Sequence, residues 1–281
     1  MGVRSPSYQA GFYAPERGGR PAYPGLWRGC VGAWNPGLGS SGLVLRDWGG
    51  RKNHGTLTNG PVWSTSTGQQ AISFDGVNDY VALSSPVPID LLRLASNPFT
   101  LSASLRISAF ATQGDGSWTL FTIGGSSDYR TISFGTYAAR LVMLSSVSGG
   151  SWNIFLQGAT TLVTGITYAV SYRRSGNGVY SVLLNGRLDG SATNTGSLVL
   201  DDSTAKIATH YNLSASRYSS GSIMATSFHD RALSASEISL LARRPGIAYE
   251  LAPRRFYSLP TPSFSAAWAR RQSIIIGGGL H

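Results

Sequence analysis

Short runs in which apolar and polar residues alternate fill most of the middle of the chain. A period of two is typical of a β-strand with one buried face. Nine runs occur at the spacing expected of a two-sheet sandwich: Phe99–Ile107, Trp118–Ile123, Thr131–Phe134, Arg140–Leu144, Trp152–Leu156, Tyr168–Arg173, Val179–Leu184, Lys206–His210 and Gly221–Phe228. The pattern therefore predicts an all-β fold.

Shorter apolar runs precede these nine, at Val31–Pro36, Leu43–Leu45, Thr56–Thr58, Ala71–Phe74 and Tyr80–Leu83. The last two are joined by a tight polar turn, and the sequence predicts that they form a hairpin. Gly-Asn-Gly at 176–178 and Asn-Gly at 185–186 predict two further hairpins, because Asn and Gly both tolerate positive φ.

One helix is predicted near the end of the chain. Ser234 and Glu237 have the spacing of a capping box, and an apolar run follows them. Pro245-Gly246 then ends the helix after Arg243-Arg244.

The two ends of the chain show no sustained period. Residues 1–29 and 245–281 are interrupted by prolines and contain many aromatic residues, so we expect two extended arms flanking a sandwich at 30–244. The strand-like Ser273–Gly277 has no obvious partner in its own domain. We expect it to dock on another sheet or subunit.

The net charge of +10 over 281 residues is concentrated in these ends. Residues 1–29 hold four arginines against one glutamate, and 243–281 hold six against one, which leaves only +2 for 30–242. Arginine suits interfaces because its fork binds carboxylates bidentately and stacks on aromatics. The residues expected to mediate assembly are Arg4, Tyr8, Phe12, Tyr13, Arg17, Arg20, Arg254, Arg255, Arg270 and Arg271.

Cysteine content and hydropathy limit the cellular compartments in which we expect the protein. Cys30 is the only cysteine, so neither an internal disulfide nor a cysteine-based metal cluster is expected. No apolar run approaches the roughly 20 residues that a membrane helix needs. The first residues have no apolar segment of the kind found in secretory signal peptides.

Four motifs in order resemble one known family. They are Gly50–Leu57, Ile72–Val81, Tyr168–Tyr172 leading to Leu184–Arg187, and Asp230–Ile238. Together they are similar to the laminin-G-like (LamG-like) jelly-roll domains of the concanavalin A-like lectin and glucanase superfamily. The resemblance covers residues 30–243 and implies two antiparallel sheets packed face to face.

The resemblance raises the question of hydrolysis. Glucanases of this superfamily place paired carboxylates on one face of a strand, and glycoside hydrolysis needs two about 5–9 Å apart. Glu16, Glu237 and Glu250 all lie outside the predicted core strands, and adjacent Asp201 and Asp202 would point to opposite faces. The histidines are scattered, and His54 is expected to bond to backbone in a turn. The sequence therefore predicts a non-catalytic protein.

Two binding chemistries stay open for such a domain. Relatives of this fold often hold Ca²⁺ at the rim, and Asp75, Asn78 and Asp79 put three oxygen-bearing side chains into one turn. The alternative is that these residues only make the turn through their own backbone hydrogen bonds. Aromatic platforms for glycans are the second chemistry, with core packing as the alternative; the candidates are Trp118, Tyr129, Tyr137, Trp152 and Tyr211.

The functional hypothesis combines the sandwich with its arms. No motif for reading DNA or RNA is present, so we expect the arms to bind acidic protein neighbours rather than nucleic acid. Such modules usually work outside cells, and a virion protein released by lysis needs neither a signal peptide nor disulfides. The sequence predicts a phage virion subunit, such as a capsid-decoration, head-fibre or tail protein, anchored by its arms. The alternative is a free lectin-like protein, with or without calcium.

Overall fold

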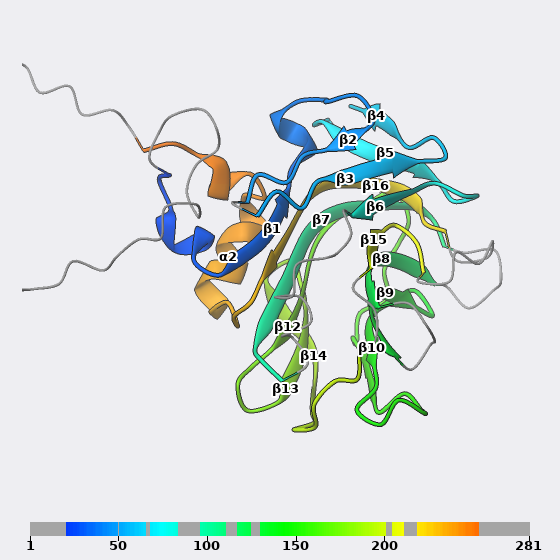
Figure 1. Ribbon diagram of the computed structural model, residues 1–281, viewed down its shortest axis with the longest axis vertical. Coiled ribbons are helices and arrows are strands. Elements are labelled where there is room, and N and C mark those ends of the chain that lie inside the picture. The colour runs from blue at the N-terminus through cyan, green and yellow to red at the C-terminus, as the bar shows by residue number, and fades with distance from the viewer. Residues whose placement is uncertain are drawn as a thin grey trace, which may run out of the picture.

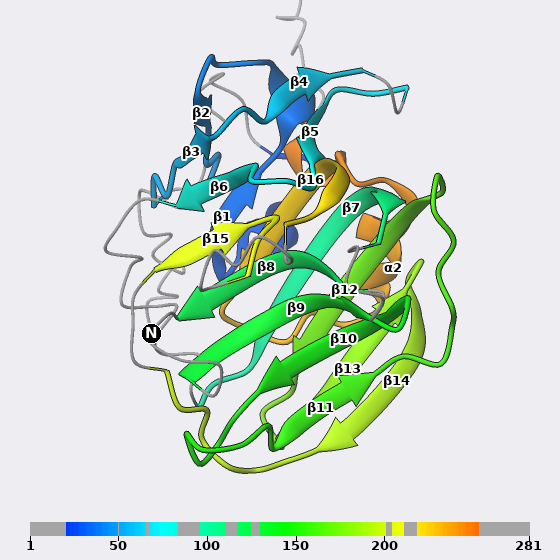
Figure 2. The same cartoon turned by 90° about the vertical axis from the view of Figure 1, so that its right-hand side faces the viewer.

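The computed structural model describes residues 21–49, 51–65, 68–83, 96–110, 117–124, 130–200, 204–210 and 218–252. Two antiparallel eight-stranded sheets pack face to face (Figures 1 and 2). This arrangement confirms the predicted two-sheet sandwich. No helix in the described ranges is long and apolar enough to cross a membrane.

The back sheet is the one that carries helix α2, Ala235–Arg243, on its outer face (Figure 1). Its strands, in spatial order, are β14 (Arg187–Thr193), β13 (Val179–Leu184), β12 (Thr167–Arg174), β7 (Phe99–Ala109), β16 (Ser220–His229), β5 (Ala71–Asp75) and β4 (Val62–Ser64). β1 (Cys30–Trp34) also pairs with β16.

The front sheet faces the viewer in Figure 2. Its order is β11 (Ile154–Gln157), β10 (Arg140–Ser145), β9 (Thr131–Tyr137), β8 (Trp118–Gly124), β15 (Ala205–Ile207), β6 (Tyr80–Leu83), β3 (Gly55–Thr58) and β2 (Val44–Leu45). A short 3₁₀ turn, η2 (Pro36–Leu38), follows β1.

Aromatic rings from both sheets fill the space between them. The Phe134 ring of the front sheet lies 5.9 Å from that of Phe99 and 5.3 Å from that of Tyr172, both on the back sheet. All three residues are at most 1% exposed. Burying each such side chain contributes about 1.5–3 kcal/mol. Because strand residues alternate faces, this inward set fixes which neighbours point outward.

The predicted hairpin of Ala71–Phe74 with Tyr80–Leu83 is wrong. β5 pairs with β16 and β4 in the back sheet, whereas β6 pairs with β3 and β15 in the front sheet. The turn between them carries the chain from one sheet to the other. Gly76 permits this at φ +83°, and a Cβ there would come within 2.8 Å of Ser220 Cβ.

The two glycine hairpins are confirmed. Asn185 and Gly186, at φ 50° and 79°, join β13 to β14, and Gly178, at φ 67°, lies in the turn between β12 and β13. Strands β4 and β14 are not among the predicted runs. β14 is an edge strand with no buried residue, so it has no apolar alternation to detect.

The predicted helix and its capping box are confirmed. The Ser234 hydroxyl accepts from Glu237 N at 3.2 Å, and the Glu237 carboxylate accepts from Ser234 N at 2.8 Å. Ile238, on the inner side of the helix, is fully buried.

The two ends of the described chain meet on the back sheet. Residues 21–28, with η1 (Pro24–Trp27), lie against residues 245–252, with η5 (Ile247–Tyr249). Pro21 forms an isolated β-bridge with Leu251, and the Trp27 indole donates a hydrogen bond to Ala248 O at 2.6 Å. We call residues 21–28 and 245–252 the terminal joint. All ten residues predicted for assembly lie outside the described ranges.

Candidate functional site

A strained hairpin presents one of the predicted aromatic residues. Tyr137 ends β9 and Arg140 begins β10, and the two are direct cross-strand partners. Ala138 and Ala139 form the turn between them, with φ of 49° and 56°. For an L-residue other than Gly or Asn this region costs roughly 1–2 kcal/mol per position. The turn therefore holds Tyr137 and Arg140 side by side at an energetic cost.

A second aromatic side chain stands beside Tyr137. The Phe155 ring lies 5.6 Å from the Tyr137 ring, edge to face at 81°. Ile154 and Leu156 are buried in the core, so Phe155 between them points out of the front sheet. Tyr137 is 41% exposed and Phe155 50% exposed. The two exposed rings in contact form a small apolar platform on the outer face of the front sheet.

Hydrogen bonds from the end of β11 and from the loop after it hold this hairpin in place. Gln157 Nε2 donates to Tyr137 O at 2.8 Å, and Leu162 N donates to Ala139 O at 2.7 Å. The site is therefore largely formed before any ligand arrives. We call Tyr137, Arg140, Phe155 and Gln157 the aromatic corner.

The other aromatic candidates have different positions. Trp118 is a core residue, 2% exposed, whose indole donates to Ser220 O at 2.9 Å, so it cannot stack on a sugar. Trp152 is half-buried in the loop before β11. Tyr129 and Tyr211 lie outside the described residues. Sequence reasoning missed Phe155, although its place between two inward residues of the run Trp152–Leu156 was the available signal.

The three predicted calcium ligands form the turn between the sheets. Asp75 Oδ1 accepts from Val77 N at 2.8 Å, and Asp79 Oδ2 accepts from Asp75 N at 3.0 Å. Asp79 is 4% exposed, and its burial raises the pKa of its carboxyl group. Asp75 and Asn78 are exposed. Calcium binding here stays a prediction, and a calorimetric titration with Ca²⁺ would test it.

Another polar cluster is structural. Asp47 is 6% exposed, and its carboxylate accepts from the backbone amides of Ala33, Gly49 and Asn53 at 2.7–2.8 Å. Burial raises the pKa of Asp47, and these three bonds oppose that rise. His54 Nδ1 accepts from Asp47 N at 3.0 Å, which confirms that His54 bonds to backbone in a turn.

Carboxylates on the described strands are far apart. They are Asp75, at the end of β5, and Asp189, on β14. Five strand-to-strand steps separate β5 from β14, or roughly 24 Å at about 4.8 Å per step. Hydrolysis of a glycosidic bond needs two carboxyls about 5–9 Å apart. These two cannot act together on one bond.

A family model described as the concanavalin A-like lectin/glucanases superfamily (Laminin_G_3) matches residues 75–239. The match takes in the turn between the sheets, the aromatic corner and the start of α2. The chain belongs to this family. The LamG-like resemblance inferred from the four motifs is therefore confirmed.

Solved structures share the fold of this LamG-like chain. The sialidase of Trypanosoma rangeli is 17% identical with a TM-score of 0.57, and the match covers 79% of this chain and 34% of the sialidase. The binding domain of Paraclostridial Mosquitocidal Protein 1 is 13% identical with a TM-score of 0.60, covering 76% of this chain and 52% of that one. The LamG-like chain thus spans about a third and about half of these proteins. No curated protein matches its sequence.

Proposed function

We propose that the chain is a non-catalytic carbohydrate-binding sandwich and that its aromatic corner contacts the sugar. The observation that carries this proposal is the exposed edge-to-face pair of Tyr137 and Phe155 on the outer face of the front sheet.

The chemistry of the corner suits a sugar. A pyranose ring has apolar C–H faces and a rim of hydroxyls. Aromatic rings pack against the C–H faces, and their rigidity keeps the entropic cost of ordering low. The Tyr137 hydroxyl, the Arg140 guanidinium and the Gln157 amide supply hydrogen-bonding groups for the rim. The corner thus combines an apolar platform with a few polar groups, the same kinds of group that line small-molecule sites.

Binding without hydrolysis is supported by the separation of Asp75 and Asp189, and the neighbouring carboxyls of Asp75 and Asp79 both accept from backbone amides of their turn. No other carboxylate lies on a described strand. The likeness to the Paraclostridial structure, which is itself described as a binding domain, agrees with a recognition role at the level of the fold.

A glycan array tests this proposal. We expect the full chain to bind a subset of glycans and Tyr137→Ala to lose those signals. Val62→Ala is the matched control, because Val62 is an exposed apolar residue (59%) on β4, an edge of the other sheet. Absence of any glycan signal from the wild-type chain would contradict the proposal.

A second proposal concerns attachment to a larger assembly, and a phage virion is our candidate. Two observations favour it. Residues 1–20 hold three arginines and one glutamate, and 253–281 hold four arginines and no acidic residue, a net charge of +6. The terminal joint brings Pro21 and Leu251 together, so described residues close in sequence to both segments lie side by side. Acidic surfaces of protein neighbours would complement this charge.

Truncation tests the attachment. Removing 1–20 and 253–281 keeps the joint, because its bridge and the Trp27–Ala248 hydrogen bond lie within 21–252. We expect the truncated chain to fold and to bind the same glycans but to lose association with its assembly. Normal assembly of the truncated chain would contradict the proposal.

A further inference from the structure

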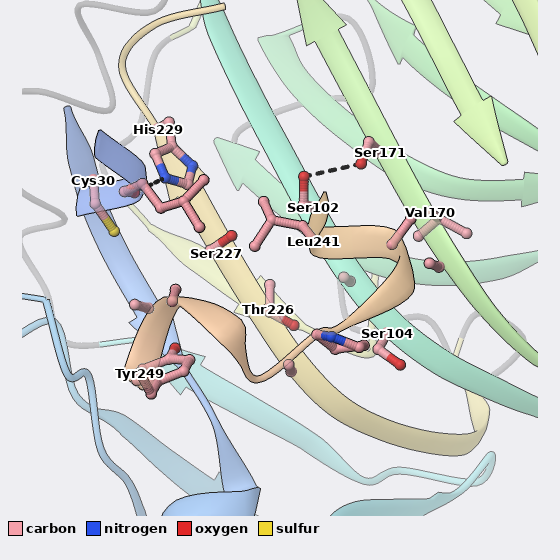
Figure 3. A pocket seen from close by; sticks show the side chains of 18 of the residues that line it. Cys30, Ser102, Ser104, Val170, Ser171, Thr226, Ser227, His229, Leu241 and Tyr249 are labelled. Atoms are coloured by element: carbon pink, nitrogen blue, oxygen red, sulfur yellow. Dashed lines mark hydrogen bonds between the residues drawn. The ribbon is translucent and has the colours of Figure 1, made fainter. Parts of the chain in front are cut away.

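A small cavity lies between helix α2 and the outer face of the back sheet (Figure 3). Its floor is made of small side chains that alternate with core residues along β7, β12 and β16, and its roof is made by α2 and the terminal joint. Floor residues include Ser102, Ser104, Ser171 and Ser227, and roof residues include Trp27, Leu241 and Tyr249. The cavity volume is about 30 Å³.

The lining contains two buried polar atoms without a hydrogen-bond partner, Thr226 Oγ1 and His229 Nδ1. His229 ends β16 and is 2% exposed. Its Nε2 lies 2.8 Å from Leu26 O, and a carbonyl can only accept, so Nε2 carries the hydrogen. Nδ1 is then a bare acceptor, and it has no hydrogen-bond partner. Buried acceptors in native proteins normally have one, supplied by protein or by an ordered molecule.

The rest of the lining limits what that partner can be. No Asp, Glu, Lys or Arg is among the residues around this cavity. A charged ligand would lose its hydration there without a counter-charge. The Ser102 and Ser171 hydroxyls bond to each other at 2.9 Å, so they are already engaged. A cavity needs roughly 10–15 Å³ to hold one water molecule, and this cavity of about 30 Å³ admits an occupant of only a few heavy atoms.

We propose that this cavity binds a small neutral molecule whose hydroxyl donates a hydrogen bond to Nδ1 of His229. Two sources supply that chemistry, an ordered water and a short-chain alcohol whose carbon atoms would contact Leu241.

Occupancy of this site acts on the terminal joint through the imidazole ring. A donor at Nδ1 polarises the ring and strengthens the bond from Nε2 to Leu26 O, since hydrogen bonds in a chain reinforce one another. Leu26 lies in η1, so the ligand helps to hold the first segment of the joint on the sheet.

Crystals of the full chain grown without alcohol, and the same crystals soaked in ethanol, test the proposal and distinguish the sources. We expect density for an oxygen within about 3.2 Å of His229 Nδ1 in both. Density that grows to include two carbon atoms in ethanol identifies an alcohol site, and unchanged density identifies a water site. An empty cavity in both crystals would overturn the proposal.

Two variants keep the test decisive. Gln at position 229 can still donate to Leu26 O through its amide nitrogen but has no acceptor at the position of Nδ1, so His229→Gln should lose the density while keeping the joint. Leu241→Phe should exclude the occupant by filling the cavity from the roof, and it decides the matter if His229→Gln does not fold. Density that persists beside position 229 in both variants would contradict the assignment.

Discussion

Ala138 and Ala139 hold left-handed backbone conformations at the one turn that presents Tyr137 and Arg140. A two-residue hairpin with both φ values positive favours Asn-Gly, because Gly has no Cβ and Asn tolerates the left-handed region. The sequence has that pair at 185–186 but two alanines here. Strain of this kind is concentrated at functional sites, which agrees with a recognition role for this corner.

Relief of the strain gives a prediction for stability. Ala139→Gly should raise the free energy of unfolding by about 0.5–1 kcal/mol, since Gly removes the Cβ clash but gains entropy in the unfolded chain. Thermal unfolding should show a midpoint higher by roughly 1–3 °C. Ala192→Gly is the control. Ala192 is exposed in β14 and has no positive φ, so that change should lower the midpoint.

The burial of His229 predicts that the folded protein loses stability in acid. Burial lowers the pKa of His229 from 6.5 to about 4, with Arg231 acting in the same direction and the Leu26 bond and Glu237 opposing it. The unfolded chain therefore takes up this proton first as the pH falls. Above about pH 6.5, neutral His229 makes its full contribution to the free energy of unfolding. This contribution decreases as the pH falls towards 4, by up to roughly 3 kcal/mol.

Denaturant unfolding of the wild-type chain and His229→Gln at pH 7 and pH 4 checks this prediction. The wild type should lose more stability than the variant over that interval. Equal losses would show that His229 does not titrate across it.

At the scale of elements, one arginine connects α2 to the terminal joint. Arg231 forms a two-pronged ion pair with Glu237 at 2.7 and 3.0 Å. It also donates to Arg28 O at 2.7 Å and to Gly25 O at 2.8 Å. The capping box of Ser234 and Glu237 thus extends through Arg231 to the first segment of the joint.

Glu237→Gln should weaken this connection. The hydrogen bonds from Arg231 hold the pKa of Glu237 at about 2, below its ordinary 4.5, so its carboxylate stabilises the fold above pH 4.5 and this contribution is lost as the pH falls to 2. At pH 7 we expect a loss of about 1–3 kcal/mol. The difference between wild type and variant, measured by denaturant unfolding, should shrink between pH 4.5 and 2. A difference independent of pH would contradict this assignment.

Element prediction from sequence succeeded where burial imposes a period and failed where it does not. The core strands, the helix and two glycine hairpins follow from alternation, a capping box and positive-φ residues. β14 was not predicted because both of its faces are accessible to solvent, so its sequence shows no apolar alternation. The predicted hairpin at 71–83 is wrong because a tight Asp-Gly turn has the same sequence signature whether the next strand joins the same sheet or the opposite one. Only the pairing of β5 with β16 and of β6 with β3 decides that.

At the scale of the whole molecule, the proposed sugar site and the proposed attachment site lie on opposite faces. The aromatic corner points out of the front sheet, and the terminal joint lies on the outer face of the back sheet (Figure 1). Sequence reasoning found Tyr137 but could not place it beside Phe155, because their contact joins β9 to β11 across β10. The same reasoning offered Trp118, which the register directs into the core.

The most direct measurement is isothermal titration calorimetry of the best glycan from the array against the wild-type chain, Phe155→Ala and Val62→Ala. Loss of the Phe155 ring should weaken binding at least tenfold, which corresponds to about 1.4 kcal/mol. Val62→Ala should bind as the wild type does, because Val62 lies on the other sheet. Unchanged affinity in Phe155→Ala would contradict the assignment of the aromatic corner as the sugar-binding site.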